Sequence, residues 1–316
     1  MSADDLFPAV EPFESGHLPV DSRHSIYWEQ SGNPAGKTVV FLHGGPGAGA
    51  MPQHRQFFDP QAYRIVIFDQ RGAGRSIPLG EITDNTTEHL IADMEALRQY
   101  LKIQRWMLFG GSWGSSLALA YAEKYPYRCI GLILRGIFLC RLHEIEWFLH
   151  GMGNFFPEAQ KKFVEYLPPD ERGNLLSNYY RRLTNADPEV HMPAAHAWSR
   201  YESSCSTLLP STEVVAALTD PASSLGLARI EAHYFTNNFF MEEGMLLAHV
   251  GKLAGIPGVI VQGRYDIICP ILSATELADV WPLADLRIVP DAGHSAVEPG
   301  IRTALVQATE QMKSQI

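Results

Sequence analysis

The sequence predicts an α/β fold in which a mostly parallel central sheet, flanked by helices, is interrupted by an all-helical segment. Three observations support this prediction. Apolar runs of strand length alternate with helical patterns from about residue 38 to residue 136, and strand patterns return at residue 258. The segment between them has no buried-strand run but many aromatic residues, separated by prolines. Alternating strands and helices are typical of a parallel sheet with helices on both faces.

The first predicted strands lie in the N-terminal third of the chain. Residues 24–30 alternate between apolar and polar side chains, as a strand with one solvated face does. Residues 38–42 and 64–68 are continuous apolar runs, which are typical of strands covered on both faces. Residues 86–102 carry apolar side chains at helical spacing after a threonine-rich cap signal, so we expect a helix there.

Further elements follow toward the C-terminus. The apolar run at residues 106–111 leads into a helix-forming segment, and residues 129–136 have another buried-strand pattern. After the aromatic segment, strand patterns occur over residues 258–266 and 286–289. Residues 301–314 predict a final helix.

The aromatic segment is predicted to be an inserted domain and not a linker. It shows no low-complexity composition, and its aromatic side chains need a core to pack in. We therefore expect residues 137–240 to form a helical cap domain, and residues 1–136 and 241–316 to form the core. A chain of 316 residues is long enough to bury both.

Composition excludes several classes of function. The net charge of −10 and the absence of basic clusters argue against a nucleic-acid partner. No apolar run approaches the roughly 20 residues that span a bilayer, and the N-terminus lacks a secretory signal, so we expect no membrane partner and a cytoplasmic protein. The four cysteines are Cys129, Cys140, Cys205 and Cys269. They are too sparse for a disulfide framework or a zinc site, so no metal is predicted.

Ser112 lies in the segment Gly110-Gly111-Ser112-Trp113-Gly114, which has the G-x-S-x-G spacing. A strand-like run precedes it and a helix-forming run follows it, as in a nucleophile elbow. Glycines are needed there because side chains would collide with neighbouring backbone in such a tight turn. Taken alone, the pattern also fits a glycine-rich turn that binds nothing, so its weight depends on the rest of the chain.

Two further residues complete a candidate catalytic triad. Asp266 follows one of the later strands and His294 follows the last, which reproduces the Ser…Asp…His chain order of α/β hydrolases. All three side chains are then expected at the carboxyl ends of strands, where open α/β sheets place their sites. In such a triad Ser112 attacks a carbonyl, His294 transfers the proton, and Asp266 orients the imidazole.

The glycine-rich segment His43-Gly44-Gly45-Pro46-Gly47 follows a buried strand. In this fold such a turn presents one backbone N–H to the oxyanion, and the residue after the nucleophile presents the other. We therefore predict that the N–H groups of Gly45 and Trp113 form the oxyanion hole.

Residues 45–50 also fit the G-x-G-x-x-A pattern of a dinucleotide site, with Asp69 at the end of the next strand. Against this alternative, Pro46 stiffens the loop, no helix start follows it, and the elbow, Asp266 and His294 would be left unexplained. Asp69 and Arg71 are expected to lock the loop through an ion pair and hydrogen bonds, because a triad already supplies the acid and the base.

Five motifs in this order resemble the proline iminopeptidases, the prolyl aminopeptidases of the α/β-hydrolase superfamily, from about residue 20 to the C-terminus. They are His43-Gly44-Gly45-Pro46-Gly47, Asp69-Gln70-Arg71-Gly72, Gly110-Gly111-Ser112-Trp113-Gly114-Ser115, Gly263-Arg264-Tyr265-Asp266 and Gly293-His294. The resemblance implies a serine exopeptidase that releases N-terminal proline from small peptides, without a metal or an organic cofactor.

The resemblance also implies how the substrate amine is held. Two glutamates of the cap bind the prolyl nitrogen in this family, and they match Glu202 in Trp198-Ser199-Arg200-Tyr201-Glu202 and Glu231 further along. Tyr201 replaces a second tryptophan of the family motif, which leaves the width of the proline pocket open.

Two other functions stay open at this point. An esterase or amidase of small acyl substrates would use the same triad, so only the cap discriminates it from a peptidase. A non-enzymatic ligand-binding relative is disfavoured because no triad position is lost, and reaction of Ser112 with a phosphonate would exclude it.

Cys269, three residues after Asp266, is either near the triad or a small buried apolar side chain. Oligomeric state, peptide length and tolerance for hydroxyproline or alanine are left open.

Overall fold

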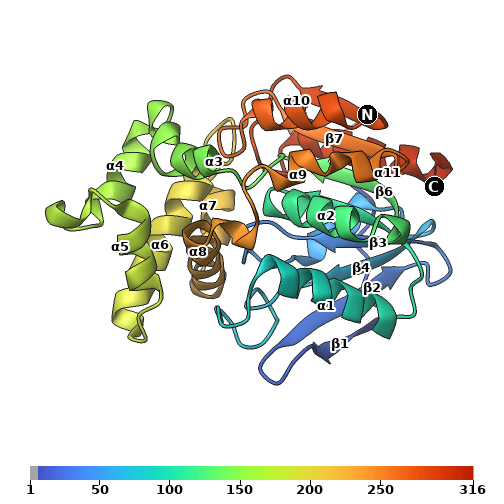
Figure 1. Ribbon diagram of the computed structural model, residues 1–316, viewed down its shortest axis with the longest axis horizontal. Helices are drawn as coiled ribbons and strands as arrows, with labels where there is room; N and C mark the ends of the chain where they lie inside the picture. The colour runs from blue at the N-terminus through green and yellow to red at the C-terminus, as the bar shows by residue number, and fades with distance from the viewer. Residues whose placement is uncertain (1–5, 316) are drawn as a thin grey trace.

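The computed structural model describes residues 6–315 and contains one eight-stranded sheet with the order β1-β2-β4-β3-β5-β6-β7-β8 (Figure 1). β1 and β2 pair antiparallel, as do β2 and β4, and every other pair is parallel. The strands are β1 (Glu14–Pro19), β2 (Ser25–Gly32), β3 (Lys37–Leu42), β4 (Tyr63–Phe68), β5 (Trp106–Gly111), β6 (Cys129–Arg135), β7 (Gly258–Gly263) and β8 (Ala284–Val289).

The strand order reverses between β3 and β5. From β3 the chain continues to β4 on one side, whereas from β5 it continues to β6 on the other. The loops that leave β3 and β5 therefore diverge, and open α/β sheets bind their ligands in the crevice at such a point. The glycine-rich loop and the elbow are those two loops.

Alternating side chains of the central strands divide the core between the two faces of the sheet. Val40, Leu42 and Leu108 point toward one face, and Val39 and Phe41 toward the other. The first face is covered by α1 (Thr87–Tyr100), α2 (Trp113–Lys124) and α10 (Ile271–Val280), and the second by α11 (Pro299–Gln315) and the 3₁₀ helix Pro52–Phe57.

These features confirm the predicted α/β fold and its mostly parallel sheet. Several elements were missing from the prediction, among them β1, α10 and the 3₁₀ helix Pro52–Phe57, which begins where no helix start was expected. β1 is an edge strand whose side chains are mostly exposed, so its residues lack the apolar pattern of a strand. The sequence of α10 carries apolar residues all round, and its helical period is therefore weak.

The described chain forms helices and no strand between β6 and β7. These are α3 (Leu142–Glu146), α4 (Pro157–Glu165), α5 (Leu175–Leu183), α6 (Pro188–Cys205), α7 (Thr212–Leu218) and α8 (Pro221–Thr236). We call α3–α8 the cap helices. Figure 1 shows them together on one side of the sheet. The short helix α9 (Met245–Ala248) follows before the chain re-enters the sheet.

The aromatic residues of the cap helices pack against one another. Phe163 stacks on Tyr179 and on Tyr201 with ring centroids 4.4 Å apart in both pairs, and Trp198 lies edge-on to it at 5.6 Å. All four side chains are buried. Aromatic pairs of this kind add about 0.5–1.5 kcal/mol each beyond the burial of their area. The aromatic side chains of the proline-broken segment thus pack together, in the same hydrophobic cluster that covers one face of the sheet.

Candidate active site

Ser112 is the turn residue between β5 and α2. Its backbone has φ 57° and ψ −129°, a strained conformation for a residue with a side chain. The glycines on either side leave no room for a methyl group. A Cβ on Gly110 would lie 2.2 Å from the carbonyl oxygen of Gly114, and one on Gly114 would lie 2.1 Å from that of Leu42. The G-x-S-x-G spacing therefore reflects close approach of backbone around the serine.

Asp266 and His294, predicted from strand order alone, form a hydrogen-bonded pair. The His294 Nδ1 atom lies 3.0 Å and 2.9 Å from the two carboxylate oxygens of Asp266. Asp266 is itself held by the Cys269 N–H at 2.8 Å and by the Gln262 side-chain amide at 3.1 Å. These bonds aim the carboxylate at Nδ1, so Nε2 of His294 is the ring nitrogen left to accept a proton.

Arg135, which the sequence analysis did not consider, contacts that nitrogen. Its Nη1 atom lies 3.0 Å from His294 Nε2 and 2.8 Å from the His294 carbonyl oxygen. Burial lowers the pKa of Arg135, and the nearby Asp266 counteracts this effect. A charged residue at the end of the otherwise apolar strand β6 was the signal that could have identified it.

The hydroxyl of Ser112 has a different neighbour in this structure. It contacts the Cys269 thiol, whose pKa is raised well above its usual range by burial. Among residues 6–315 no hydrogen bond links Ser112 to His294. Catalytic hydrogen bonds are often formed only when substrate is bound. In this structure Ser112, Asp266 and His294 lie in one region, and Nε2 of His294 is bonded to Arg135.

The glycine-rich loop after β3 lies against the elbow. A Cβ on Gly44 would be 3.3 Å from the Cβ of Ser112. Gly45 has φ +108°, which glycine adopts readily. Within the described chain, the N–H groups of Gly45 and Trp113 donate to no protein acceptor. Gly44 thus places the loop beside the serine, and within the described chain both predicted oxyanion donors have no protein acceptor.

Hydrogen bonds from the following loop fix the glycine-rich loop. His43 donates from Nδ1 to the Gly44 carbonyl and accepts the Gln70 N–H at Nε2, both at 2.9 Å. Burial lowers the pKa of His43, in keeping with this neutral tautomer. The Gln70 side chain bridges the His43 carbonyl and the Trp113 indole N–H at 2.9 Å and 2.8 Å.

Asp69 and Arg71 have structural roles, but they are not paired with each other. Asp69 accepts the Ala50 N–H at 2.8 Å and pairs with Arg75 at 2.7 Å. Arg71 instead pairs with Asp93 at 2.5 Å. The expected ion pair therefore involves different partners, because the side chain of Arg71 points away from the glycine-rich loop toward α1.

Glu202 on α6 and Glu231 on α8 are brought together inside the cap helices. Their carboxyl groups are hydrogen-bonded to each other, and the Trp198 indole donates to Glu231 at 2.6 Å. Both side chains are buried, and this burial raises the pKa of Glu202 to about 7 and the pKa of Glu231 well above its usual range. Two buried carboxyl groups without a cation share protons at neutral pH.

One oxygen of this pair has no partner. The Glu202 Oε2 atom is buried and, among the described residues, makes no hydrogen bond. Leaving such a group unsatisfied costs about 1–3 kcal/mol, more when it is charged. A ligand with a charged N–H donor would satisfy it and would neutralise the carboxylate.

Helix α8 connects this carboxyl pair with the glycine-rich loop. A Cβ on Gly47 would lie 2.3 Å from the carbonyl oxygen of Gly226, and one on Gly45 would lie 3.2 Å from Leu227. The ring of Tyr234 packs edge-on against Trp113, with centroids 4.9 Å apart. The helix that carries Glu231 therefore packs against both residues that are predicted to supply the oxyanion donors.

Tyr201, the departure from the family motif, belongs to the core of the cap helices. Its hydroxyl donates to the Phe148 carbonyl at 2.9 Å, and its ring stacks on Phe163. It holds the segment around Phe148 in place and does not approach the carboxyl pair through its polar group.

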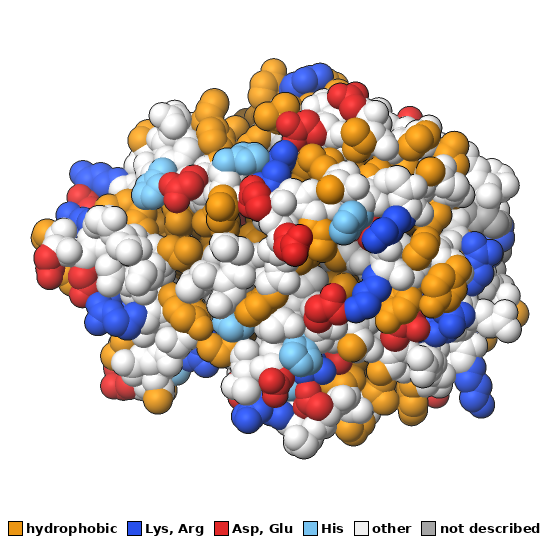
Figure 2. Space-filling view, viewed as in Figure 1, with side chains coloured by type: hydrophobic (Ala, Val, Ile, Leu, Met, Phe, Trp, Pro, Cys, Tyr) orange, Lys and Arg blue, Asp and Glu red, His pale blue; other side chains and the backbone are white. Residues whose placement is uncertain are grey.

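A separate groove of about 930 Å³ opens between α4, α6 and α7. Its lining includes Lys162, Met192 and Arg200, and none of the predicted triad, oxyanion or amine-binding residues. Figure 2 shows mixed apolar and charged side chains over the face in view, without one dominant patch. Within residues 6–315, no three histidine, cysteine or acidic side chains are placed to hold a metal ion.

The contact between Gly47 and Gly226 leads to a prediction. Gly47→Ala is expected to lower kcat/KM by about 100-fold or more, because the added methyl group displaces the oxyanion loop, and one such donor contributes about 2.7–4 kcal/mol. Gly251→Ala is the control, since a Cβ there meets nothing within 4 Å. Kinetics with an acyl ester and thermal unfolding measure the effect. Equal activity of the two variants would contradict the assignment of the loop.

Comparison with known proteins agrees with this geometry. Residues 37–300 match the sequence family described as the alpha/beta hydrolase fold. The chain is 51% identical over 312 residues to a probable proline iminopeptidase of Leptolyngbya boryana, covering 98% of this chain and 97% of the relative. It is also 51% identical to a proline iminopeptidase of Arabidopsis thaliana, covering 98% of this chain and 82% of that one.

Solved structures show the same fold. A proline iminopeptidase-related protein of Thermus thermophilus superposes with a TM-score of 0.58 at 24% identity, over 96% of this chain and 98% of that one. A putative lipase of Acinetobacter baumannii superposes with a TM-score of 0.63 at 15% identity, over 97% and 92% of the two chains. The identity to the curated relatives extends over nearly the whole chain, and the protein therefore belongs to the proline iminopeptidase family of α/β hydrolases.

Proposed function

We propose that the protein is a serine exopeptidase that releases proline from the N-terminus of small peptides. The observation that carries this proposal is the buried carboxyl pair of Glu202 on α6 and Glu231 on α8, with one oxygen unsatisfied, where α8 also contacts the oxyanion loop. An esterase of neutral acyl groups has no use for two buried carboxyl groups, whose desolvation is costly. Family membership and the names of the relatives support the same activity.

In the proposed acylation step, the Ser112 hydroxyl attacks the prolyl carbonyl carbon while His294 Nε2 takes its proton. The oxyanion accepts hydrogen bonds from the N–H groups of Gly45 and Trp113. His294 then protonates the leaving nitrogen, the peptide bond breaks, and a prolyl ester of Ser112 remains. Arg135 has to release Nε2 before this transfer, because a nitrogen that accepts one hydrogen bond has no second lone pair for the serine proton.

Deacylation repeats these roles with water. His294 removes a proton from the water molecule, which attacks the prolyl ester, and then returns the proton to Ser112 as proline leaves. Throughout both steps, the secondary ammonium group of the substrate is bound by Glu202 and Glu231. Because the carboxyl pair is buried among cap helices, an N-terminal extension has no space beyond it, which makes the enzyme an exopeptidase.

A comparison of three arylamides tests the proposal. Pro-arylamide is expected to be cleaved much faster than N-acyl-Pro-arylamide, by about 30-fold or more, since breaking a buried charge pair costs about 2–5 kcal/mol. Ala-arylamide is expected to be a poorer substrate because it fills the proline site less completely. Equal cleavage of the N-acylated compound would favour the esterase or amidase alternative. A serine-directed phosphonate, which should label Ser112, verifies that the preparation is active.

The raised pKa of Glu202 predicts a pH dependence. A glutamate with its pKa at about 7 loses its charge at a higher pH than an ordinary glutamate. The ratio of kcat/KM for Pro-arylamide to kcat/KM for a simple acyl ester is therefore expected to fall as the pH is lowered from about 7 to about 5, while the substrate amine stays charged. Titration of the shared catalytic base affects both substrates and cancels in the ratio. A flat ratio would contradict the role of Glu202.

The state of the cysteines bears on the cellular compartment of the protein. All four are free and buried thiols, as is usual in a reducing compartment. The proposal therefore places the enzyme in the cytoplasm, where short peptides with N-terminal proline are its substrates. As a separate finding, no helix within residues 6–315 is long and apolar enough to cross a membrane.

A further inference from the structure

Asn85 connects the core to the cap helix that carries Glu231. It lies in the loop before α1 and is buried, with 1% of its surface exposed. Its side-chain amide donates to the carbonyl oxygens of Arg71 at 3.0 Å and of Glu81 at 2.9 Å. These two bonds attach Asn85 to the loop that follows β4.

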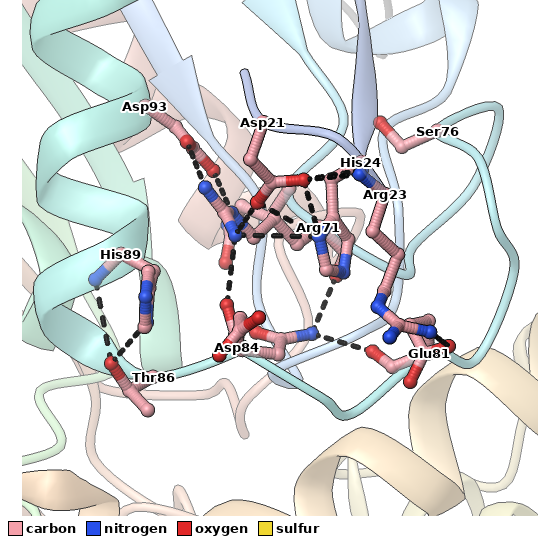
Figure 3. Close-up of polar contacts among 12 residues, drawn as sticks. Asp21, Arg23, His24, Arg71, Ser76, Glu81, Asp84, Thr86, His89 and Asp93 are labelled. Carbon is pink, nitrogen blue, oxygen red and sulfur yellow. Dashed lines mark hydrogen bonds and ion pairs between the residues drawn. The ribbon is translucent and has the colours of Figure 1, made fainter. Parts of the chain in front are cut away.

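That loop is held rigidly by a cluster of charged residues (Figure 3). The Arg71 guanidinium makes two hydrogen bonds to Asp93, at 2.5 Å and 2.7 Å, and a third to Asp21 at 2.6 Å. It also donates to the Asp84 carbonyl oxygen at 2.8 Å, directly before Asn85. Bidentate arginine–carboxylate pairs are strong and geometrically specific. Asn85 is therefore attached to a fixed part of the core.

On its other side, Asn85 binds two consecutive residues of α8. The Tyr234 hydroxyl donates to the Asn85 side-chain oxygen at 3.0 Å, and His233 Nε2 lies 3.1 Å from the Asn85 carbonyl oxygen. Burial lowers the pKa of His233. The neutral ring donates from Nε2 and accepts from Tyr180 at Nδ1, where the two atoms are 3.2 Å apart.

The bonds from Asn85 affect the active site because they meet α8 close to Glu231. Tyr234 is one helical turn after Glu231, so the two side chains lie on the same face of the helix. The Tyr234 ring also contacts Trp113, the residue after Ser112. A rotation or shift of α8 that moves Glu231 away from the serine would have to break the Asn85 bonds, because they fix the helix at that turn.

We propose that Asn85 is a positioning residue for substrate recognition: through Tyr234 and His233 it holds α8 so that Glu231 lies at the right distance from Ser112 to receive the prolyl amine. This inference rests on the proposed aminopeptidase function. The loop before α1 touches neither the triad nor the substrate. Through Asn85 it nevertheless affects amine binding, and it has no effect on acyl transfer.

Tyr234→Phe is the first test, because it removes a single hydroxyl and keeps the ring against Trp113. KM for Pro-arylamide is expected to rise about five- to ten-fold, the effect of one lost buried hydrogen bond. Hydrolysis of p-nitrophenyl acetate, which has no amine, should stay within about two-fold of wild type. Asn85→Ala removes all the side-chain bonds and should give a larger rise in KM for the arylamide with the same small effect on the ester.

Tyr63→Phe is the matched control. Its hydroxyl is also buried and donates to the Thr309 carbonyl at 2.6 Å, but on the opposite face of the sheet. It should lower the melting temperature by a similar amount and leave the ratio of the two activities unchanged. If Tyr63→Phe and Tyr234→Phe change the ratio equally, Asn85 contributes only to general stability and the inference is wrong.

A double-mutant cycle with Glu231→Gln separates positioning from other effects. If Asn85 acts through Glu231, Tyr234→Phe should have almost no further effect on KM in the Glu231→Gln background. Additive effects would overturn the inference while leaving the aminopeptidase function standing. Failure of the wild-type enzyme to cleave Pro-arylamide, with normal hydrolysis of the ester, would overturn the proposed function itself and the inference with it.

Discussion

Replacing Asp266 with asparagine is expected to lower kcat by about 10⁴-fold and to leave the fold intact. Asparagine has the shape of aspartate, but its NH₂ group donates where the carboxylate accepts the His294 Nδ1–H bond. The imidazole then takes the other tautomer, with its proton on Nε2. In that form it cannot accept the proton of Ser112, and its N–H also faces the Arg135 donor 3.0 Å away.

The measurement is kcat for an acyl ester and for Pro-arylamide, which should fall together because both need the base. Asp285→Asn is a suitable control, since Asp285 lies on β8 at the surface and pairs with Arg287. Phosphonate labelling of Ser112 should slow by a comparable factor. An Asp266→Asn enzyme that keeps a tenth or more of its activity would show that the pair with His294 is not part of the mechanism.

The second large effect is expected for Glu202→Gln. The amide is neutral, so the buried charge pair with the substrate ammonium is lost, at a cost of about 2–5 kcal/mol or more. The kcat/KM for Pro-arylamide should therefore decrease about 30-fold to more than 1,000-fold. Hydrolysis of a simple acyl ester should be nearly unaffected, because no charged amine takes part.

Glu189→Gln, on the same helix but exposed, is the matched control and should leave both activities unchanged. The dependence of the activity ratio on pH below about 7 should also disappear in Glu202→Gln, because the titrating group is gone. Equal losses on the amide and the ester would contradict an amine-binding role. They would point to a disturbed cap instead.

The sequence carried enough information for the fold because the signals were local. Continuous apolar runs predicted the central strands, and the order of Ser112, Asp266 and His294 along them predicted one site at their carboxyl ends. Backbone geometry explains why the elbow was visible: Gly110 and Gly114 have no space for a side chain. Such constraints act within a few residues and therefore leave a recognisable spacing.

The unpredicted features depend on contacts between distant segments. Arg135 meets His294 across 159 positions, and Asn85 meets Tyr234 across 149. Nothing in the neighbourhood of Asn85 distinguishes it from an ordinary turn residue before a helix. The expected Asp69–Arg71 pair was wrong for the same reason. Asp69 pairs with Arg75 and Arg71 pairs with Asp93, because tertiary packing decides the direction of side chains in a loop.

The backbone contact between Gly47 and Gly226 couples substrate binding by the cap helices to oxyanion stabilisation by the glycine-rich loop. Since α8 touches the loop through a glycine on each side, the turn around Gly226 cannot move without displacing the loop that stabilises the oxyanion. A change in substrate size is therefore easier to accommodate from α6, which carries Glu202 and makes no such contact. We expect that altered acyl specificity can be obtained by substitutions on α6, whereas substitutions that displace the Gly226 turn of α8 reduce the rate for every substrate.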